Sequence, residues 1–129
     1  MRKILFRGKC AHDGKWHEGN LVHQTEFYGD PVDCYHIVDI GEFDVDYYTS
    51  TEVIPETIGQ FTGVLDMNGN KVFEGDIIKA NSTVYICLWD ECNFEFGLRN
   101  NKESLGMAYV YPYVEVIGNI YDNPELLED

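Results

Sequence analysis

The sequence predicts a mainly β protein, and three observations lead to that fold class. Short runs of β-branched and aromatic residues recur along the 129 residues, and Gly, Pro, Asn and Asp separate them. Apolar residues show hardly any helical spacing. The dipeptides Asp13-Gly14 and Asn68-Gly69 stand between such runs, and pairs of this kind are strong short-range signals for a β-hairpin.

A repeated motif predicts that the same bent hairpin occurs twice. "FRGKCAHDGKWHEGNLV" and "FTGVLDMNGNKVFEGDII" share Phe-x-Gly, then Asp-Gly or Asn-Gly, then Glu-Gly before two aliphatic residues. We expect hairpins that pair 3–9 with 16–23 and 60–65 with 71–79. A two-residue type I′ turn at each dipeptide would need positive φ at both central positions. Gly19 and Gly75 interrupt the second strands, where a bulge or bend is expected.

The other elements follow from composition. "CYHIVDI" and "FDVDYYTSTEVIP" are strand-like, and Pro55 is expected to end the second of them. Residues 83–89 and 93–98 predict a strand pair, and 109–121 a last long strand. Asp122 or Asn123 can cap a short C-terminal helical turn that Pro124 opens.

The chain is expected to have two parts, 1–56 and 57–129, which could also form one compact unit. The seam lies near Pro55, between the two copies of the hairpin. In the second part, "VFEGDIIKA" followed by "TVYICLWDE" has the rhythm of a small SH3-like barrel. The first part is predicted to be an irregular β subdomain.

The net charge and the hydropathy of the chain reduce the number of functions that need to be considered. The net charge is −14 and the pI about 4.4, so the surface repels phosphate and favours a protein partner with a basic surface over nucleic acid. No apolar run is long enough for a membrane span, and the N-terminus lacks a signal peptide. We therefore expect a protein of the bacterial cytoplasm with four reduced cysteines.

Three blocks of the sequence carry a family resemblance. "MRKILFRGK" with "DGKWHEGNLV", "TIGQFTGVLDMNGNKVFEGDIIK" and "VEVIGNIYDNPELL" resemble, in this order, the YopX family of small proteins from bacteriophages and prophages of Gram-positive bacteria. The resemblance implies a β-rich fold and a phage origin. The family has no established biochemical activity, so the resemblance supplies no catalytic or binding residues and leaves the mechanism open.

Two Cys-x-His units are the first candidate for chemistry. Cys10 with His12, and Cys34 with His36, could each offer a thiolate and an imidazole from one strand face, and together a Cys₂His₂ zinc set. Ordinary packing is the competing interpretation, and we expect no metal or other cofactor. The spacing of Cys87 and Cys92 is not that of a redox motif.

Alternating carboxylates form the second candidate. Asp39, Glu42, Asp44 and Asp46 alternate with apolar residues, which indicates a strand with one solvated face. An acid–base pair for hydrolysis would instead need a carboxyl with a raised pKa in a cleft.

The segment "MAYVYPYVEV" is the third candidate. Tyr109, Tyr111 and Tyr113 recur with period two and would share one strand face. They would either pack partly on the core or form an interface, since tyrosine combines contact area with a polar tip.

These observations favour a phage or prophage accessory protein without chemistry of its own. It would act by binding a host or phage protein, or by assembling as a homo-oligomer. One alternative is a metal-dependent or hydrolytic enzyme that uses the Cys-x-His pairs or the carboxylates. The other is nucleic-acid binding through the small barrel.

Overall fold

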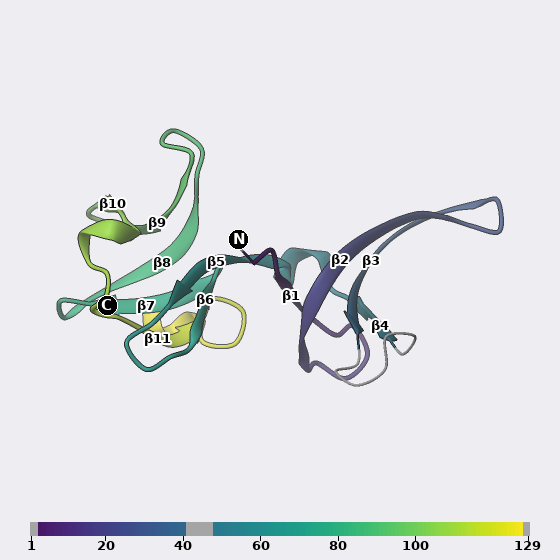
Figure 1. The fold of residues 1–129 in the computed structure, drawn as a ribbon, viewed down its shortest axis with the longest axis horizontal. Helices are drawn as coiled ribbons and strands as arrows, with labels where there is room; N and C mark the ends of the chain where they lie inside the picture. The colour runs from purple at the N-terminus through teal and green to yellow at the C-terminus, as the bar shows by residue number, and fades with distance from the viewer. Residues whose placement is uncertain (1–2, 41–47, 128–129) are drawn as a thin grey trace. The chain divides into compact units, whose positions relative to one another are not determined.

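The computed structural model describes residues 3–40 and 48–127, which divide into two compact units, Met1–Gln60 and Phe61–Asp129. The described residues are mainly β, with antiparallel strands and short 3₁₀ turns (Figure 1). The strands are β1 (Phe6–Lys9), β2 (Trp16–Phe27), β3 (Asp30–Ile40), β4 (Tyr48–Val53), β5 (Gly59–Leu65), β6 (Lys71–Phe73), β7 (Asp76–Ala80), β8 (Thr83–Asp90), β9 (Glu95–Arg99), β10 (Ser104–Gly106) and β11 (Val114–Asn119). The 3₁₀ turns are η1 (Pro55–Thr57), η2 (Met107–Tyr109) and η3 (Pro124–Leu127).

In the first unit the strands lie in the order β4-β3-β2-β1, and the first two residues of β5 pair with β1, with Gln60 opposite Phe6. The predicted pairing of the first hairpin is confirmed, with Gly8 opposite His17 and Lys9 opposite Trp16. The strand predicted at 34–40 is confirmed as the C-terminal part of β3. The next one is described from Tyr48 onward, and it ends before Pro55 as expected.

One face of this sheet buries the small core of the first unit. Cys10, Ile37 and Val53 are at most 6% exposed. Thr57 supports them from η1, where its hydroxyl accepts the N–H of Lys9 at 2.9 Å and donates to the carbonyl of Ile54 at 2.6 Å. The core is therefore built from side chains of four different segments.

The interruption expected at Gly19 is absent, because β2 continues through this residue as one strand. Gly19 is needed for a different reason, which is the close approach of β3. A Cβ at this position would lie 2.3 Å from the carbonyl oxygen of Val38. In the second copy Gly75 does interrupt the strand, with φ +90°, and separates β6 from β7. The predicted pairing of 60–65 with 71–79 is therefore confirmed only for β5 with β6, because β7 pairs with β8 and β11 instead. The two glycines of the repeat thus serve different purposes.

The two-residue type I′ turns are also wrong. The loops are longer, and only their glycines, Gly14 at φ 72° and Gly69 at φ 84°, have positive φ. In the second loop the Gly69 N–H donates to the carbonyl of Asp66 at 3.0 Å. A turn followed by a left-handed glycine is the usual three-residue hairpin loop. Asn68 has a negative φ because this type of turn requires positive φ only at the glycine.

The second unit contains a five-stranded antiparallel sheet in the order β10-β9-β8-β7-β11. The predicted pair of 83–89 with 93–98 is confirmed as β8 and β9. Closure into an SH3-like barrel stays a prediction. The core of this unit is apolar and consists of Val72, Ile78, Ala80, Tyr85, Cys87, Leu98, Met107, Val110 and Val114.

The long last strand predicted for 109–121 is wrong over its first half. Met107 and Val110 are buried three residues apart, a spacing that a 3₁₀ turn presents to one side. The N–H of Tyr111 donates to the carbonyl of Met107, and that of Tyr113 to Val110. These local bonds replace a strand ladder, so β11 starts only at Val114.

The predicted C-terminal helical turn is present as η3. Its N-terminal side is closed by the main chain of Asn123, whose carbonyl accepts the N–H of Leu126 at 3.1 Å. The Asn123 side chain instead accepts the N–H of Asn119 at 3.2 Å. Within residues 3–40 and 48–127, no helix has the length and apolar character that crossing a membrane requires.

Candidate interaction surface

The outer half of the β2–β3 hairpin extends beyond the strands that flank its base (Figure 1). On one side β1 pairs with β2 only from Trp16 to Gly19. On the other side β4 pairs with β3 only from Tyr35 onward. Residues 22–34, which we call the arm, therefore pair only within the β2–β3 hairpin in the ladders of the described residues. A two-stranded ribbon of this kind is marginally stable in water by itself.

The end of the arm carries two exposed aromatic side chains. Phe27 is 57% exposed and Tyr28 is 91% exposed. Their rings meet edge to face with centroids 4.5 Å apart, so they form one apolar tip. Tyr28 has φ 51° and Gly29 φ 85°, which gives a tight turn and leaves both rings directed to solvent.

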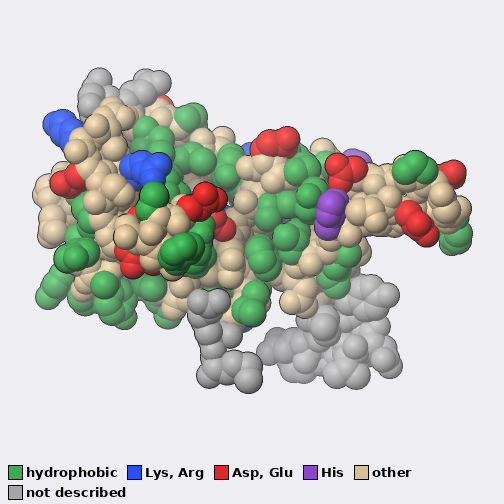
Figure 2. Space-filling view, turned by 90° about the horizontal axis from the view of Figure 1, so that it is seen from above, with side chains coloured by type: hydrophobic (Ala, Val, Ile, Leu, Met, Phe, Trp, Pro, Cys, Tyr) green, Lys and Arg blue, Asp and Glu red, His purple; other side chains and the backbone are tan. Residues whose placement is uncertain are grey.

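The charge of the arm is acidic throughout. Its acids are Glu26, Asp30 and Asp33, and the sequence has no Lys or Arg between Lys15 and Lys71. Figure 2 shows acidic and hydrophobic side chains together at the end of the arm. An apolar tip surrounded by carboxylates complements a partner that has an apolar pocket with a basic rim.

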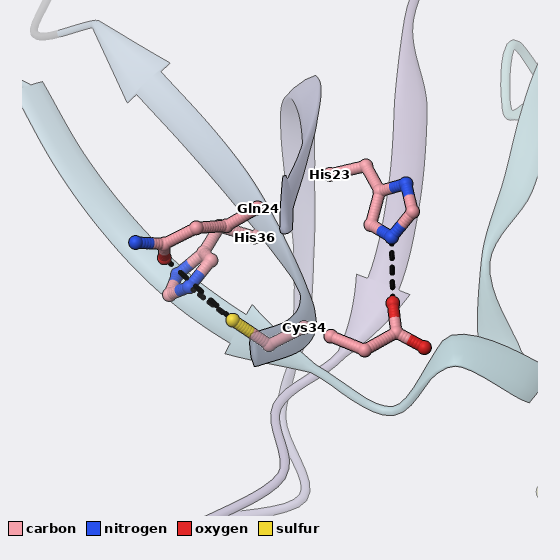
Figure 3. Close-up of polar contacts among 5 residues, drawn as sticks. His23, Gln24, Cys34 and His36 are labelled. Carbon is pink, nitrogen blue, oxygen red and sulfur yellow. Dashed lines mark hydrogen bonds and ion pairs between the residues drawn. The ribbon is translucent and has the colours of Figure 1, made fainter. Parts of the chain in front are cut away.

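The base of the arm is held by contacts between its two strands (Figure 3). His23 Nε2 lies 2.6 Å from Asp33 Oδ1, and the His23 ring stacks on Tyr35 with centroids 4.2 Å apart. Both partners of the His23–Asp33 pair are exposed, at 44% and 80%. A pair this exposed orients the strands more than it stabilises them.

On the opposite face a thiol meets an imidazole. Cys34 Sγ lies 3.5 Å from His36 Nε2 and donates to Gln24 Oε1 at 3.6 Å, as Figure 3 shows. The other ring nitrogen of His36 lies 3.2 Å from the hydroxyl of Ser50. A thiol next to a base that a third group orients is the arrangement that activates cysteine nucleophiles.

The structure does not bring any three of the four predicted zinc ligands together. Cys34 and His36 form the contact just described, whereas Cys10 lies beside Asp13 and His17. The carboxylate of Asp13 accepts hydrogen bonds from the N–H of Lys15 and from the Cys10 thiol, which hold its pKa below the ordinary value. Asp39 is exposed on β3, and the other predicted carboxylates lie outside the described residues.

The three predicted tyrosines are between 55% and 84% exposed. They do not form a strand stripe, because Tyr109 belongs to η2 while Tyr111 and Tyr113 lie in the loop before β11. They make a second exposed aromatic segment, which we call the tyrosine loop (residues 107–113).

A groove of about 480 Å³ lies on the second unit. It brings Arg99 and Lys102 together with Asn100 and Leu126. Two cations therefore lie beside amide and hydroxyl groups in this groove.

Comparison with known proteins places the chain in a family. The family model described as YopX protein matches residues 5–128. The chain belongs to the YopX family. Protein EF1440 from Enterococcus faecalis, known from a crystal structure, has the same fold, with a TM-score of 0.59 and 19% sequence identity over 99% of this chain and 100% of that one. No curated protein sequence matches this chain.

The arm of this YopX protein was not among the sequence-predicted sites. The signal that could have found it is "EFYGDP", where aromatic residues directly precede a turn. Aromatic side chains in a turn that joins two strands cannot pack between them, so they are left in solvent. The length of the ribbon could not be predicted, because it depends on where the neighbouring strands end.

Proposed function

We propose that this protein is a phage or prophage accessory protein that acts in the bacterial cytoplasm by binding another protein through its arm. The observation that carries the proposal is the apolar tip, Phe27 with Tyr28, at the end of an acidic ribbon. Such a tip buries aromatic area on a partner at low cost in side-chain entropy. Pairing with a partner also stabilises a ribbon that is weak alone.

The acidic charge selects the class of partner. Glu26 and Asp30 flank the tip and Asp33 lies at the base of the arm, with no Lys or Arg between Lys15 and Lys71 in the sequence. A partner with a basic rim is attracted at long range, whereas contact of two arms would set like charges against each other. This favours a heterologous protein over the homo-oligomer that the composition also suggested.

The test is affinity capture from the lysate of a Gram-positive host, with bound proteins identified by mass spectrometry. Replacing Phe27 and Tyr28 by Ser is expected to weaken capture roughly thirtyfold, since loss of an aromatic anchor costs about 2 kcal/mol. Reversing the three arm acids to Lys is expected to abolish capture at low salt and to matter less at high salt.

Matched controls use the second unit. Replacing Tyr109, Tyr111 and Tyr113 by Ser removes more exposed aromatic area than the arm variant does, and reversing Glu91, Glu95 and Glu125 reverses the same number of charges. Both are expected to leave capture by the arm unchanged. Equal loss in the tyrosine-loop variant, or recovery of this chain alone, would contradict the proposal and favour the tyrosine loop or self-assembly.

A second candidate function is thiol chemistry at Cys34, which its 3.5 Å contact with His36 favours. We expect iodoacetamide to alkylate Cys34 several-fold more slowly at neutral pH in the variant His36→Ala, because no base then lies 3.5 Å from the sulfur. His23→Ala is the matched control, since it removes an imidazole from the other face. Equal alkylation rates in wild type and His36→Ala would remove this candidate.

A further inference from the structure

The loop between β1 and β2 gathers three side chains that ligate metals. Cys10 Sγ, a carboxylate oxygen of Asp13 and a ring nitrogen of His17 all lie within 4.8 Å of one another. The three residues come from the end of β1, the loop and the start of β2. They differ from the four ligands that the Cys-x-His pattern predicts, sharing only Cys10.

Main-chain hydrogen bonds hold the loop in this shape. The N–H of Cys10 donates to the carbonyl of Lys15 at 2.8 Å, and that of Gly14 to the carbonyl of Cys10 at 3.1 Å. Opposite residues of an antiparallel pair point to the same side, and His17 lies opposite Gly8, two residues before Cys10. The imidazole and the thiol therefore emerge on the same face of the hairpin.

The surroundings of the ligand atoms match those of a metal ligand set. The N–H of His12 donates to Cys10 Sγ at 3.4 Å, which orients the sulfur. The N–H of Lys15 donates to Asp13 Oδ1 at 2.9 Å, which orients the carboxylate. Hydrogen bonds of this kind orient the side chains that bind the metal directly, and they are common in metal sites.

His17 supplies an independent observation. Its Nε2 is buried and has no hydrogen-bond partner. A buried polar atom without a partner costs free energy, on the order of 1–3 kcal/mol, and coordination to a metal is one way to satisfy an imidazole nitrogen. The cluster thus contains an imidazole nitrogen for which a bound metal ion would supply the missing partner.

We propose that Cys10, Asp13 and His17 bind a transition-metal ion, with Zn²⁺ as the best fit. One sulfur, one nitrogen and one oxygen ligand suit Zn²⁺ and disfavour Mg²⁺ and Ca²⁺, which take oxygen ligands. Three protein ligands leave the fourth tetrahedral position for water or for a group from a binding partner.

The three ligand atoms need to move only slightly closer together to bind one ion. Tetrahedral Zn²⁺ with bonds of about 2.0–2.3 Å sets its ligand atoms roughly 3.3–3.8 Å apart. Asp13 is exposed, whereas Cys10 is 6% exposed in the core. The carboxylate is therefore the ligand that moves, while the thiolate and the imidazole stay in place.

The experiment titrates the metal-free full chain with Zn²⁺ in competition with a chromophoric chelator, and repeats the titration with Co²⁺. We expect one ion per chain and a sulfur-to-cobalt charge-transfer band in the near ultraviolet. Cys10→Ser and His17→Gln are each expected to weaken binding at least about a hundredfold, because even changes in outer contacts cost 10- to 100-fold.

Three matched variants control for other ligands. Cys92→Ser removes an exposed thiol, Cys34→Ser removes the thiol of the other Cys-x-His unit, and His12→Gln removes the neighbouring imidazole. All three are expected to keep the wild-type affinity and the cobalt band. Circular dichroism checks folding, and the exposed Asp13→Asn keeps the test valid if Cys10→Ser does not fold.

Three results would overturn the proposal. The first is less than one Zn²⁺ per folded wild-type chain at saturating metal. The second is unchanged Zn²⁺ affinity in folded His17→Gln and Asp13→Asn. Loss of binding in Cys34→Ser would also contradict it, because that result would assign the ion to the Cys-x-His set instead.

Discussion

Replacing Asp66 with Asn is expected to lower the free energy of unfolding of the second unit by about 3 kcal/mol. Asp66 is 6% exposed. Its Oδ1 accepts the N–H groups of Asn68 at 2.9 Å and Asn70 at 2.8 Å. Its Oδ2 accepts the N–H of Val116 at 2.9 Å. A carboxylate only accepts hydrogen bonds, but the amide of Asn must point its NH₂ at one of these donors.

The same substitution is expected to change the dependence of stability on pH. Burial raises the pKa of Asp66, but the N–H groups of Val116, Asn70 and Asn68 outweigh it and hold the pKa below its ordinary value of 3.8. A depressed pKa contributes stability above the unfolded pKa that is lost as the pH falls through the folded one. The difference between wild type and Asp66→Asn should therefore be constant above about pH 5 and shrink in acid.

Urea unfolding followed by Trp fluorescence measures both effects. Each unit contains one Trp, Trp16 in the first and Trp89 in the second, so a Trp16→Phe background reports on the second unit alone. Asp90→Asn is the matched control, because Asp90 accepts similar bonds from Cys92 and Asn93 in an exposed turn. Equal losses in the two variants would show that burial of Asp66 does not set its contribution.

Gly19→Ala is expected to cost the first unit about 3 kcal/mol. Its Cβ would lie 2.3 Å from the carbonyl oxygen of Val38 and 3.2 Å from Cγ2 of Ile37. The oxygen belongs to the backbone of β3, so it cannot move aside without disturbing the pairing of Asn20 with Val38. The substitution therefore separates β2 from β3 at the base of the arm.

Gly29→Ala at the end of the same hairpin is the matched control. Gly29 has φ +85° and no atom within 4 Å of its added Cβ, so only the left-handed backbone opposes Ala, at about 1 kcal/mol. Urea unfolding in a Trp89→Phe background measures both variants. A loss for Gly19→Ala no larger than that for Gly29→Ala would refute the close-approach explanation.

Local patterns were reliable where the physical cause is itself local. Gly14 and Gly69 were predicted as turn residues and have positive φ, because only Gly adopts that conformation freely. The strands β3, β8 and β9 follow from β-branched and aromatic runs between turns. The mainly β fold and the YopX resemblance were correct for the same reason, since both depend on short motifs in order.

The repeat shows a feature that local sequence patterns cannot predict. Gly19 and Gly75 occupy the same place in the motif, yet one accommodates a neighbouring strand and the other a left-handed turn. The sequence around each contains Glu-Gly and two aliphatics, so nothing nearby separates them. The difference comes from β3, which packs against Gly19 from outside the repeat.

The sequence by itself determined the fold class, the first hairpin and the family, because turn chemistry and strand composition act between neighbours in the chain. Only the tertiary structure decided that Asp66 accepts a hydrogen bond from Val116, fifty residues away. It also decided that Cys10 lies near His17 rather than near Cys34, and that the arm extends beyond its flanking strands. Each of these depends on strand register and on where neighbouring strands end, which long-range packing sets and local sequence does not record.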